Sequence, residues 1–323
     1  MVINYCFTVY NEPELLKHTI LRLQHPNARF FIHVDKRVDE GVFREVLDEF
    51  CNVKFIEERV VSMWGDISTV DAILALLKTA LADGEEGYCV ILSGQDYPIK
   101  TPHHIFQYLR ESWPKEFIHA SAELEWSPEL KDIMDSHAKG YWISLSGKIK
   151  LVIYPHQYCK ISGLPSLRLS QIPSIFRKLF SINTLKVIGQ CYFKPRQIPS
   201  GINLYASETW FQITTNAARY VLDFLADTPA VYEFYRYFGL PEECMIQSII
   251  LSNPIFKNRW HGDFLSLIKR DSSDPVDSLH ILPESFDRLR SAIHDNEKIL
   301  TRKVSYKDKH VIDYIDNLVD GYK

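Results

Sequence analysis

The stretch "VINYCFTVYNEPELLKHTILRLQHPNARFFIHVD", residues 2–35, decides the fold of this chain. Residues 2–9 form an apolar run of strand length, and residues 12–24 repeat apolar side chains at helical spacing with Pro13 near the start. Residues 28–35 return to a strand-like run. The order strand, helix, strand predicts two parallel strands joined by a covering helix.

This alternation continues to about residue 121, with further helices expected at 39–50, 67–82 and 102–111 and strands at 52–57, 88–93 and 115–121. The pattern predicts an α/β fold, with a mostly parallel, Rossmann-like sheet and helices on both faces. Ligands of such sheets bind at the carboxyl ends of the strands. Three polar clusters follow expected strands and should meet there: "VYNE" (9–12), "HVDKR" (33–37) and "GQDYP" (94–98).

The composition is that of a soluble globular protein, with 323 residues, 46% hydrophobic and 24% charged. No apolar run is long enough to span a bilayer, and the first residues lack the pattern of a signal peptide. The six cysteines are far apart without a C-x-x-C pair, which favours reduced, mostly buried thiols. We therefore expect a cytoplasmic protein.

The charge is strongly segregated along the chain. Residues 136–207 contain no Asp or Glu but ten Lys and Arg, so the remainder holds 27 basic residues against all 41 acidic ones. Aromatic residues are interleaved with these charges: Tyr141, Trp142, Tyr154, Tyr158 and Phe193. Two interpretations remain open, a surface for an anionic partner or a solvated basic face that balances an acidic body.

Periodicity also breaks down between residues 124 and 199, where we expect only a short strand at 149–154 and a helix at 171–180. Regularity returns at 201–214. The expected helices after that point are 215–226, 229–237, 241–252 and 287–295, with a loop-rich stretch at 253–283 and an amphipathic end at 306–322.

Six blocks occur in the order and approximate spacing of a known family: "FTVYNEPELLKHTILRLQHPNARFFIHVDKR", "WGDISTVDAILALLKTAL", "YCVILSGQDYPIKT", "ASETWFQIT", "LPEECMIQSII" and "LTRK". They resemble the core-2/I-branching N-acetylglucosaminyltransferases and peptide O-xylosyltransferases, and the chain looks like a short form without a membrane anchor. The resemblance implies a single GT-A catalytic domain, 1–323. Its parts would be a nucleotide-sugar-binding half (1–123), a basic insertion (124–200) and an acceptor and catalytic half (201–323).

The resemblance also implies an inverting transferase that uses a UDP-sugar and needs no divalent metal or other cofactor. A metal-dependent site would present an Asp-x-Asp pair, whereas Gly94-Gln95-Asp96-Tyr97 offers one carboxylate, insufficient on its own. Cations would then neutralise the departing diphosphate. The implied donor-binding residues are Val9, Tyr10, Asp35, Lys36, Trp64, Gly65, Asp96, Lys269, Arg270, Arg302 and Lys303. Read alone, Asp35 could simply cap its loop, and Arg302-Lys303 would be an ordinary exposed pair.

The catalytic base implied by the resemblance is Glu243, in Pro241-Glu242-Glu243. Glu242 stands where the family has aspartate, and Glu208, Trp210 and Glu242 are expected on the acceptor side. Two acids after a proline at a helix start are also favourable without any function, and Trp210 could be plain core.

The leading hypothesis is transfer of N-acetylglucosamine or xylose to a hydroxyl of a glycan or lipid-linked glycan, in surface polysaccharide or lipopolysaccharide synthesis. We expect no nucleic-acid partner. We also expect the basic, aromatic surface to bind peripherally to the anionic inner face of the cell membrane. One alternative is a nucleotide- or polyanion-binding module without transferase activity. Another is a metal-dependent transferase that uses Asp35 or Asp66.

Overall fold

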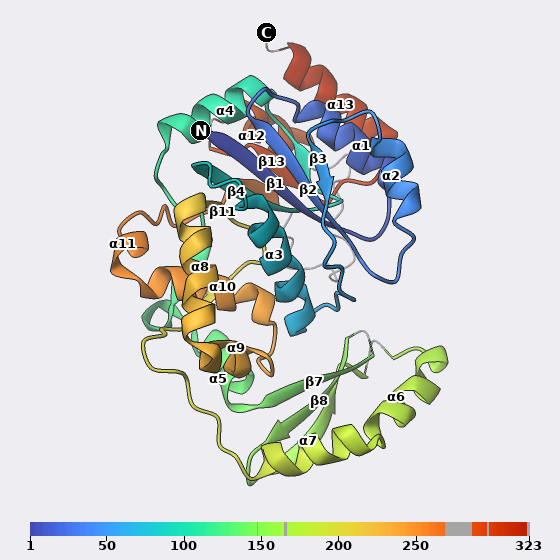
Figure 1. Ribbon diagram of the computed structural model, residues 1–323, viewed down its shortest axis with the longest axis vertical. Helices are drawn as coiled ribbons and strands as arrows, with labels where there is room; N and C mark the ends of the chain where they lie inside the picture. Colours follow the sequence, from blue (N-terminus) through green and yellow to red (C-terminus); the bar gives the residue numbers. More distant parts are fainter. Residues whose placement is uncertain (147, 165–166, 269–285, 296, 322–323) are drawn as a thin grey trace.

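The central feature of the protein is a five-stranded sheet of order β11-β4-β1-β2-β3 (Figure 1). The computed structural model describes residues 1–146, 148–164, 167–268, 286–295 and 297–321. Strand β1 pairs parallel with β2 and with β4, and β2 pairs parallel with β3. Strand β11 pairs antiparallel with β4. The strands are β1 (Val2–Val9), β2 (Ala28–Val34), β3 (Val53–Phe55), β4 (Gly87–Ser93) and β11 (Gln212–Thr214). The expected parallel sheet is confirmed, with one antiparallel edge strand added.

Helices cover both faces of this sheet, as predicted. Successive side chains of a strand point to opposite faces, so Tyr5 and Phe7 of β1 enter one core and Cys6 enters the other. The first core is closed by α1 (Pro13–Arg22), α2 (Gly41–Leu47) and α4 (Pro102–Glu111). The second is closed by α3 (Ile67–Ala80), α8 (Thr215–Asp227) and α10 (Met245–Ser252).

A small second sheet joins the C-terminal part of the chain to the segment after β4. Its order is β12-β13-β5, with β13 parallel to β12 and antiparallel to β5. The strands are β5 (Tyr97–Pro98), β12 (Ser266–Ile268) and β13 (Leu300–Arg302). Tyr97 and Ile99 pack with α12 (Phe286–His294) and α13 (Lys309–Gly321) in a third apolar cluster.

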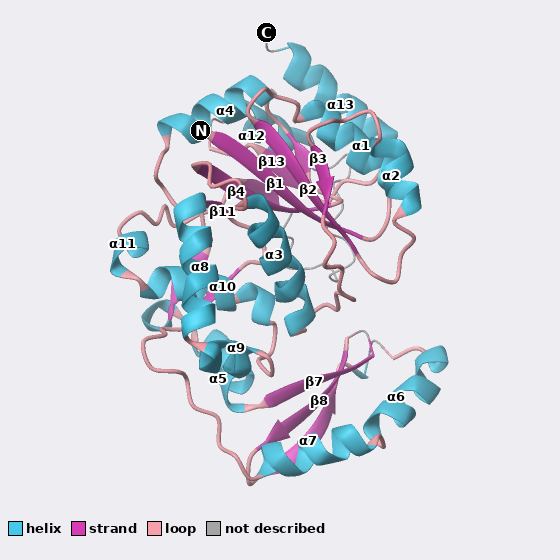
Figure 2. Cartoon of the chain, viewed as in Figure 1, coloured by secondary structure: helices cyan, strands magenta, loops and turns pink. Residues whose placement is uncertain are grey.

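The region expected as an insertion forms a layer of its own, seen at one end of the long axis in Figures 1 and 2. It contains a three-stranded antiparallel sheet, β7-β8-β9, backed by two helices with a shared apolar cluster. Its elements are α5 (Pro128–Lys139), β7 (Tyr141–Ser146), β8 (Ile149–Tyr154), β9 (Tyr158–Ser162), a 3-10 turn η3 (Leu169–Gln171), α6 (Ile172–Leu179) and α7 (Ile182–Tyr192). The strand at 149–154 and a helix within 171–180 are confirmed, whereas β7, β9, α5 and α7 were not predicted.

Several predicted boundaries were wrong. The strand expected at 115–121 is reduced to isolated bridges at Glu116 and Phe117, followed by β6 (Ala120–Ala122), which pairs with β10 (Tyr205–Ser207). The helix expected at 241–252 is divided into a 3-10 turn, η4 (Pro241–Glu243), and α10, because Cys244 between them has a non-helical φ of −144°. The other elements are a 3-10 turn η1 (Glu123–Glu125), α9 (Pro229–Tyr235) and α11 (Pro254–Lys257). The last of these lies in the stretch expected to be loop-rich.

Two further expectations concern the membrane and the cysteines. Within the described ranges, no helix is both long enough and apolar enough to cross a bilayer. All six cysteines are free thiols, and four of them are buried. The prediction of reduced, mostly buried cysteines is therefore confirmed.

Candidate functional site

The three polar clusters predicted at strand ends do meet at one edge of the main sheet. Val9 pairs with Val34 and Thr8 pairs with Ser93, so β1, β2 and β4 end side by side. The Asp35 N–H donates to the Val9 carbonyl at 2.8 Å, which ties the first two clusters together. Because the strands are parallel, all their carboxyl ends open toward the same space.

Asp35 is buried and holds the loop that follows β2. Its carboxylate accepts bonds from the Arg37 backbone N–H (2.9 Å) and guanidinium (2.9 and 2.8 Å) and from the Ser62 N–H (3.0 Å). Burial opposes ionisation of Asp35, but these hydrogen bonds outweigh it and lower the pKa. Asp35 therefore organises the loop as an anion, as in the loop-capping interpretation. Of the neighbouring candidates, Val9 is buried, while Tyr10 and Lys36 are exposed.

Asp96 lies fully buried in the turn after β4, facing Arg302. Its Oδ2 accepts from the backbone N–H (2.6 Å) and hydroxyl (2.5 Å) of Ser93, and its Oδ1 is 3.8 Å from Arg302 Nε. The antiparallel pairing of Thr301 with Tyr97 brings the two residues together, because the next pair in that register is Arg302 and Asp96. Two segments separated by about two hundred residues thus form one buried ion pair.

The Arg302 guanidinium also stacks on an aromatic ring, with Cζ 4.2 Å from the centroid of Trp210. Burial lowers the pKa of Arg302, and the nearby Asp96, Glu208 and Tyr10 oppose that shift. Asp96 Oδ1 and Arg302 Nη1 are both buried without a hydrogen-bond partner. Since buried polar atoms are normally satisfied, the two atoms mark a place where a ligand or water would complete the pair.

Two buried charged residues, Glu242 and Lys150, both bond to the Trp64-Gly65 turn. The Gly65 N–H donates to Glu242 Oε1 at 2.6 Å, and Gly65 has a φ of +67°, a conformation that glycine adopts without strain. Lys150 of β8 reaches the same turn and donates to the carbonyls of Trp64 (3.0 Å) and Gly65 (2.9 Å) and to Ser144 Oγ (2.6 Å). Lys150 therefore fastens the inserted layer to the predicted donor-binding turn.

Burial shifts the protonation of both charged partners toward the neutral form. It raises the pKa of Glu242 to about 7 and lowers the pKa of Lys150. Glu242 Oε2 is buried and has no hydrogen-bond partner. Glu243, by contrast, is half-buried, so it is the more accessible acid of the pair. Glu242 thus bonds to the Gly65 turn, and its place on the acceptor side stays a prediction.

Gln247 of α10 links the other acceptor-side candidates. Its amide nitrogen donates to the carbonyl of Glu208 at 2.7 Å and to that of Glu242 at 3.2 Å. Trp210 is half-buried and carries Arg302 on its ring. Trp210 also packs against the second core, as in the plain-core interpretation. The structure brings Glu208 and the Pro241–Glu243 turn together through Gln247.

The remaining predicted cations divide into two groups. Lys303 is half-buried and follows Arg302 at the end of β13. Lys269 and Arg270 lie outside the residues that the structure describes. Lys150 and Gln247 were missed as site residues. Each carried a signal, a lone lysine inside the apolar strand "IKLVIY" and a lone glutamine inside the apolar helix "MIQSIILS".

The basic, aromatic surface is smaller than the sequence suggested. Lys150 is buried and Arg196 is half-buried, and the Arg196 guanidinium donates to backbone carbonyls of His137, Gly140, Phe234 and Tyr237. Tyr141 is buried as well. These side chains hold the inserted layer together and are not available to an anionic partner.

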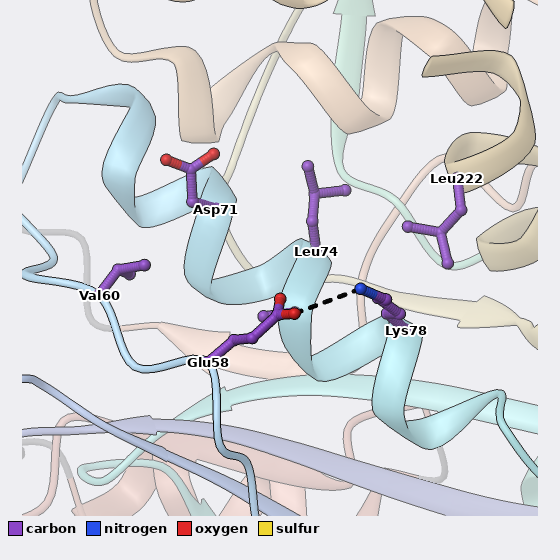
Figure 3. A pocket seen from close by; sticks show the side chains of 7 residues that line it. Glu58, Val60, Asp71, Leu74, Lys78 and Leu222 are labelled. Atoms are coloured by element: carbon purple, nitrogen blue, oxygen red, sulfur yellow. Dashed lines mark hydrogen bonds and ion pairs between the residues drawn. The ribbon is translucent and has the colours of Figure 1, made fainter. Parts of the chain in front are cut away.

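A pocket of about 260 Å³ lies elsewhere, between α3, α8 and the segment after β3 (Figure 3). Lys78 forms an ion pair of 3.3 Å with Glu58 across it, and Asp71 accepts a hydrogen bond of 2.8 Å from Tyr232. Its lining residues are Glu58, Val60, Asp71, Leu74, Ala75, Lys78 and Leu222. None of the predicted donor- or acceptor-binding residues lines this pocket.

This chain is similar to one protein family and to several known proteins. Residues 3–269 match the family model "Branch: Core-2/I-Branching enzyme". Xylosyltransferase 2 of Mus musculus is 25% identical over 247 residues, which are 74% of this chain and 23% of the mouse protein. Xylosyltransferase 2 of Homo sapiens is 25% identical over 243 residues, which are 73% of this chain and 22% of the human protein. Beta-glucuronosyltransferase GlcAT14B of Arabidopsis thaliana is 22% identical over 320 residues, 94% of this chain and 62% of that protein. The chain matches less than a quarter of the length of these xylosyltransferases.

Proposed function

Because the chain belongs to the Core-2/I-branching enzyme family, we propose that it is a glycosyltransferase that moves a sugar from a UDP-sugar to a hydroxyl of a glycan. The observation that carries this proposal is the buried pair of Asp96 and Arg302 beside three polar loops. Both side chains keep one unsatisfied polar atom where a ligand of a parallel sheet would bind. The donor would lie over this pair, within reach of the Trp64-Gly65 turn.

We propose that transfer needs no divalent metal, with Arg302 and Lys303 balancing the charge of the departing diphosphate. The arrangement of carboxylates supports this. Asp96 Oδ2 is bonded to Ser93 and its Oδ1 faces Arg302 at 3.8 Å. Asp35 is engaged by its own loop, and Asp66 Oδ1 caps α3 by accepting from the Ser68 N–H at 3.1 Å. Among the described residues, no three His, Cys, Asp or Glu side chains gather as a metal-binding group.

In the proposed reaction, Glu243 accepts the proton of the acceptor hydroxyl as the oxygen attacks the anomeric carbon. The bond between that carbon and the diphosphate oxygen breaks, and UDP leaves on the opposite face, which inverts the anomeric configuration. Half-buried Glu243 suits this role better than Glu242, since Glu242 is buried and its Oε1 is committed to the Gly65 N–H.

For the donor sugar, we propose N-acetylglucosamine or xylose, and xylose is supported by the names of the mammalian relatives. The name of the Arabidopsis relative adds glucuronic acid as a third candidate to test. The proposed acceptor is a hydroxyl of a growing surface glycan, in polysaccharide or lipopolysaccharide synthesis.

The test is a thermal-shift screen with UDP-N-acetylglucosamine, UDP-xylose and UDP-glucuronic acid, in excess EDTA, followed by donor hydrolysis and transfer assays. A ligand that binds the native state raises the melting temperature. We expect one donor to give a shift and turnover that EDTA leaves unchanged. Shifts without turnover on any glycan would favour the binding-module alternative, and activity abolished by EDTA and restored by Mn²⁺ would refute metal independence.

A further inference from the structure

The outer face of α6 and α7 carries large apolar side chains in solvent. Phe176, Phe180 and Ile182 are 58%, 67% and 82% exposed, and the two phenylalanine rings stack at 6.1 Å. A surface helix usually turns polar residues outward. Here the inward position is already filled by Ile175, which is buried in the cluster of the inserted layer. Other exposed apolar side chains of the same layer are Leu164, Leu167, Leu169, Leu185 and Phe193.

Exposed basic side chains lie on the same helices as these apolar residues. Of the ten Lys and Arg between residues 136 and 207, Lys150 is buried, Arg196 is half-buried with its guanidinium bonded to backbone carbonyls, and Lys139 pairs with Asp135. The other seven are exposed and form no ion pair with a described residue: Lys148, Lys160, Arg168, Arg177, Lys178, Lys186 and Lys194. Lys160 lies opposite Val152 of β8 and Lys148 lies 5.6 Å from the Trp64 ring, so these two are on the side of the main sheet. The other five lie on or next to η3, α6 and α7. Aromatic and aliphatic side chains among uncompensated cations are the chemistry of a surface that binds anionic lipid.

The position of this face in the fold fits such contact. In β8, Ile149, Leu151 and Ile153 point toward α6 and α7, while Lys150 points the other way, to Gly65. The helices therefore lie on the side of the small sheet that faces away from the main sheet, at the end of the molecule opposite both termini (Figure 1). A flat boundary can approach them without touching the main domain.

We propose that the outer face of α6 and α7 is a membrane-binding surface, whose apolar side chains enter the interface of an anionic bilayer while the cations contact lipid phosphates. This inference does not rest on the proposed function, since lipid binding is measured without donor or acceptor. It predicts that the Lys150 contact joins a membrane-bound layer to the Trp64-Gly65 turn, so that the site would work close to a lipid surface.

The test is sedimentation of the full chain with vesicles of phosphatidylcholine and phosphatidylglycerol in equal parts, compared with phosphatidylcholine alone. We expect binding only to the anionic vesicles, weakened by salt. The double variant Phe180→Ser/Ile182→Ser should bind roughly ten-fold or more weakly. Its matched control, Leu124→Ser/Ile255→Ser, changes equally exposed apolar residues on other elements and should bind normally.

A second pair of variants tests the charges. Arg177→Gln/Lys178→Gln should weaken binding about five-fold for each charge removed, whereas the exposed control Lys115→Gln/Arg219→Gln should change it little. Negligible or equal binding to both vesicle types would overturn the proposal, as would patch variants that bind like the unmodified chain. Self-association that disappears in Phe180→Ser/Ile182→Ser, without vesicle binding, would overturn it in favour of a second copy on this face.

Discussion

The Arg302 guanidinium stacks on the Trp210 ring, with Cζ 4.2 Å from the ring centroid, while its Nε lies 3.8 Å from Asp96 Oδ1. One side chain of β13 thus joins the proposed donor site to the proposed acceptor wall. The arrangement depends on the planar shape of arginine, since a guanidinium can stack on a ring and direct its donors sideways.

We expect Arg302→Lys to lower both stability and activity, although the substitution keeps the positive charge. Lysine keeps the charge but cannot stack flat on Trp210, so the stability should fall by about 2 kcal/mol and kcat/KM by roughly ten-fold or more. Arg44→Lys is the matched control, because Arg44 stacks on Phe55 at 4.4 Å but is exposed, and it should cost less than about 0.5 kcal/mol. Urea unfolding and initial rates would check both, and equal effects of the two variants would contradict the role of the buried pair.

Substitutions of Glu242 and Glu243 should differ in their effect on catalysis. Glu243→Gln should lower kcat by roughly 10²–10⁴-fold and leave the thermal shift given by the donor unchanged, because a general base acts only in the chemical step. Glu242→Gln should retain the bond from the Gly65 N–H and lower kcat far less. Steady-state kinetics with a saturating donor would measure this. A large kcat loss in Glu242→Gln alone would assign the base to Glu242.

Glu242 should make the stability depend on pH. In the unfolded chain its carboxyl has the ordinary pKa of 4.5, whereas burial raises it to about 7 in the folded protein. Between these values the folded state binds more protons, so the contribution of Glu242 to the free energy of unfolding falls as the pH rises from about 4.5 to about 7. The total loss is of order 3 kcal/mol at most.

Glu242→Gln should remove this part of the pH dependence, since the amide does not titrate. Urea unfolding at several pH values, compared with Glu243→Gln, isolates the effect of the buried group. If both variants kept the slope of the unmodified chain, Glu242 would not be the titrating residue.

Lys150 should matter to the site although it lies in the inserted layer. Lys150→Met leaves the Trp64 and Gly65 carbonyls and Ser144 without their donor, which should cost about 3 kcal/mol and weaken donor binding. The control is Lys148→Met, which removes an exposed cation 5.6 Å from the Trp64 ring and should cost under about 1 kcal/mol. Trp64 fluorescence and calorimetric unfolding would report both, and equal effects would show that Lys150 does not anchor the turn.

The sequence was informative wherever a pattern is local. The strand and helix periods of residues 2–111 predicted the parallel sheet, its two helical faces and the shared edge of the VYNE, HVDKR and GQDYP clusters, because hydrophobic spacing alone sets which face each element buries. It predicted the inserted layer poorly. Short strands such as β7 and β9 are stabilised by pairing with β8, a contact that no local period encodes.

By itself, therefore, the sequence determined the α/β architecture, the family resemblance and the residues brought to the strand ends. Only the tertiary structure decided their partners. It turned Glu242 inward to Gly65, placed Lys150 beneath the Trp64 turn and set Arg302 between Asp96 and Trp210. The physical reason is that burial and long-range pairing fix both the protonation state and the orientation of a charged side chain, and both depend on segments far away in the chain.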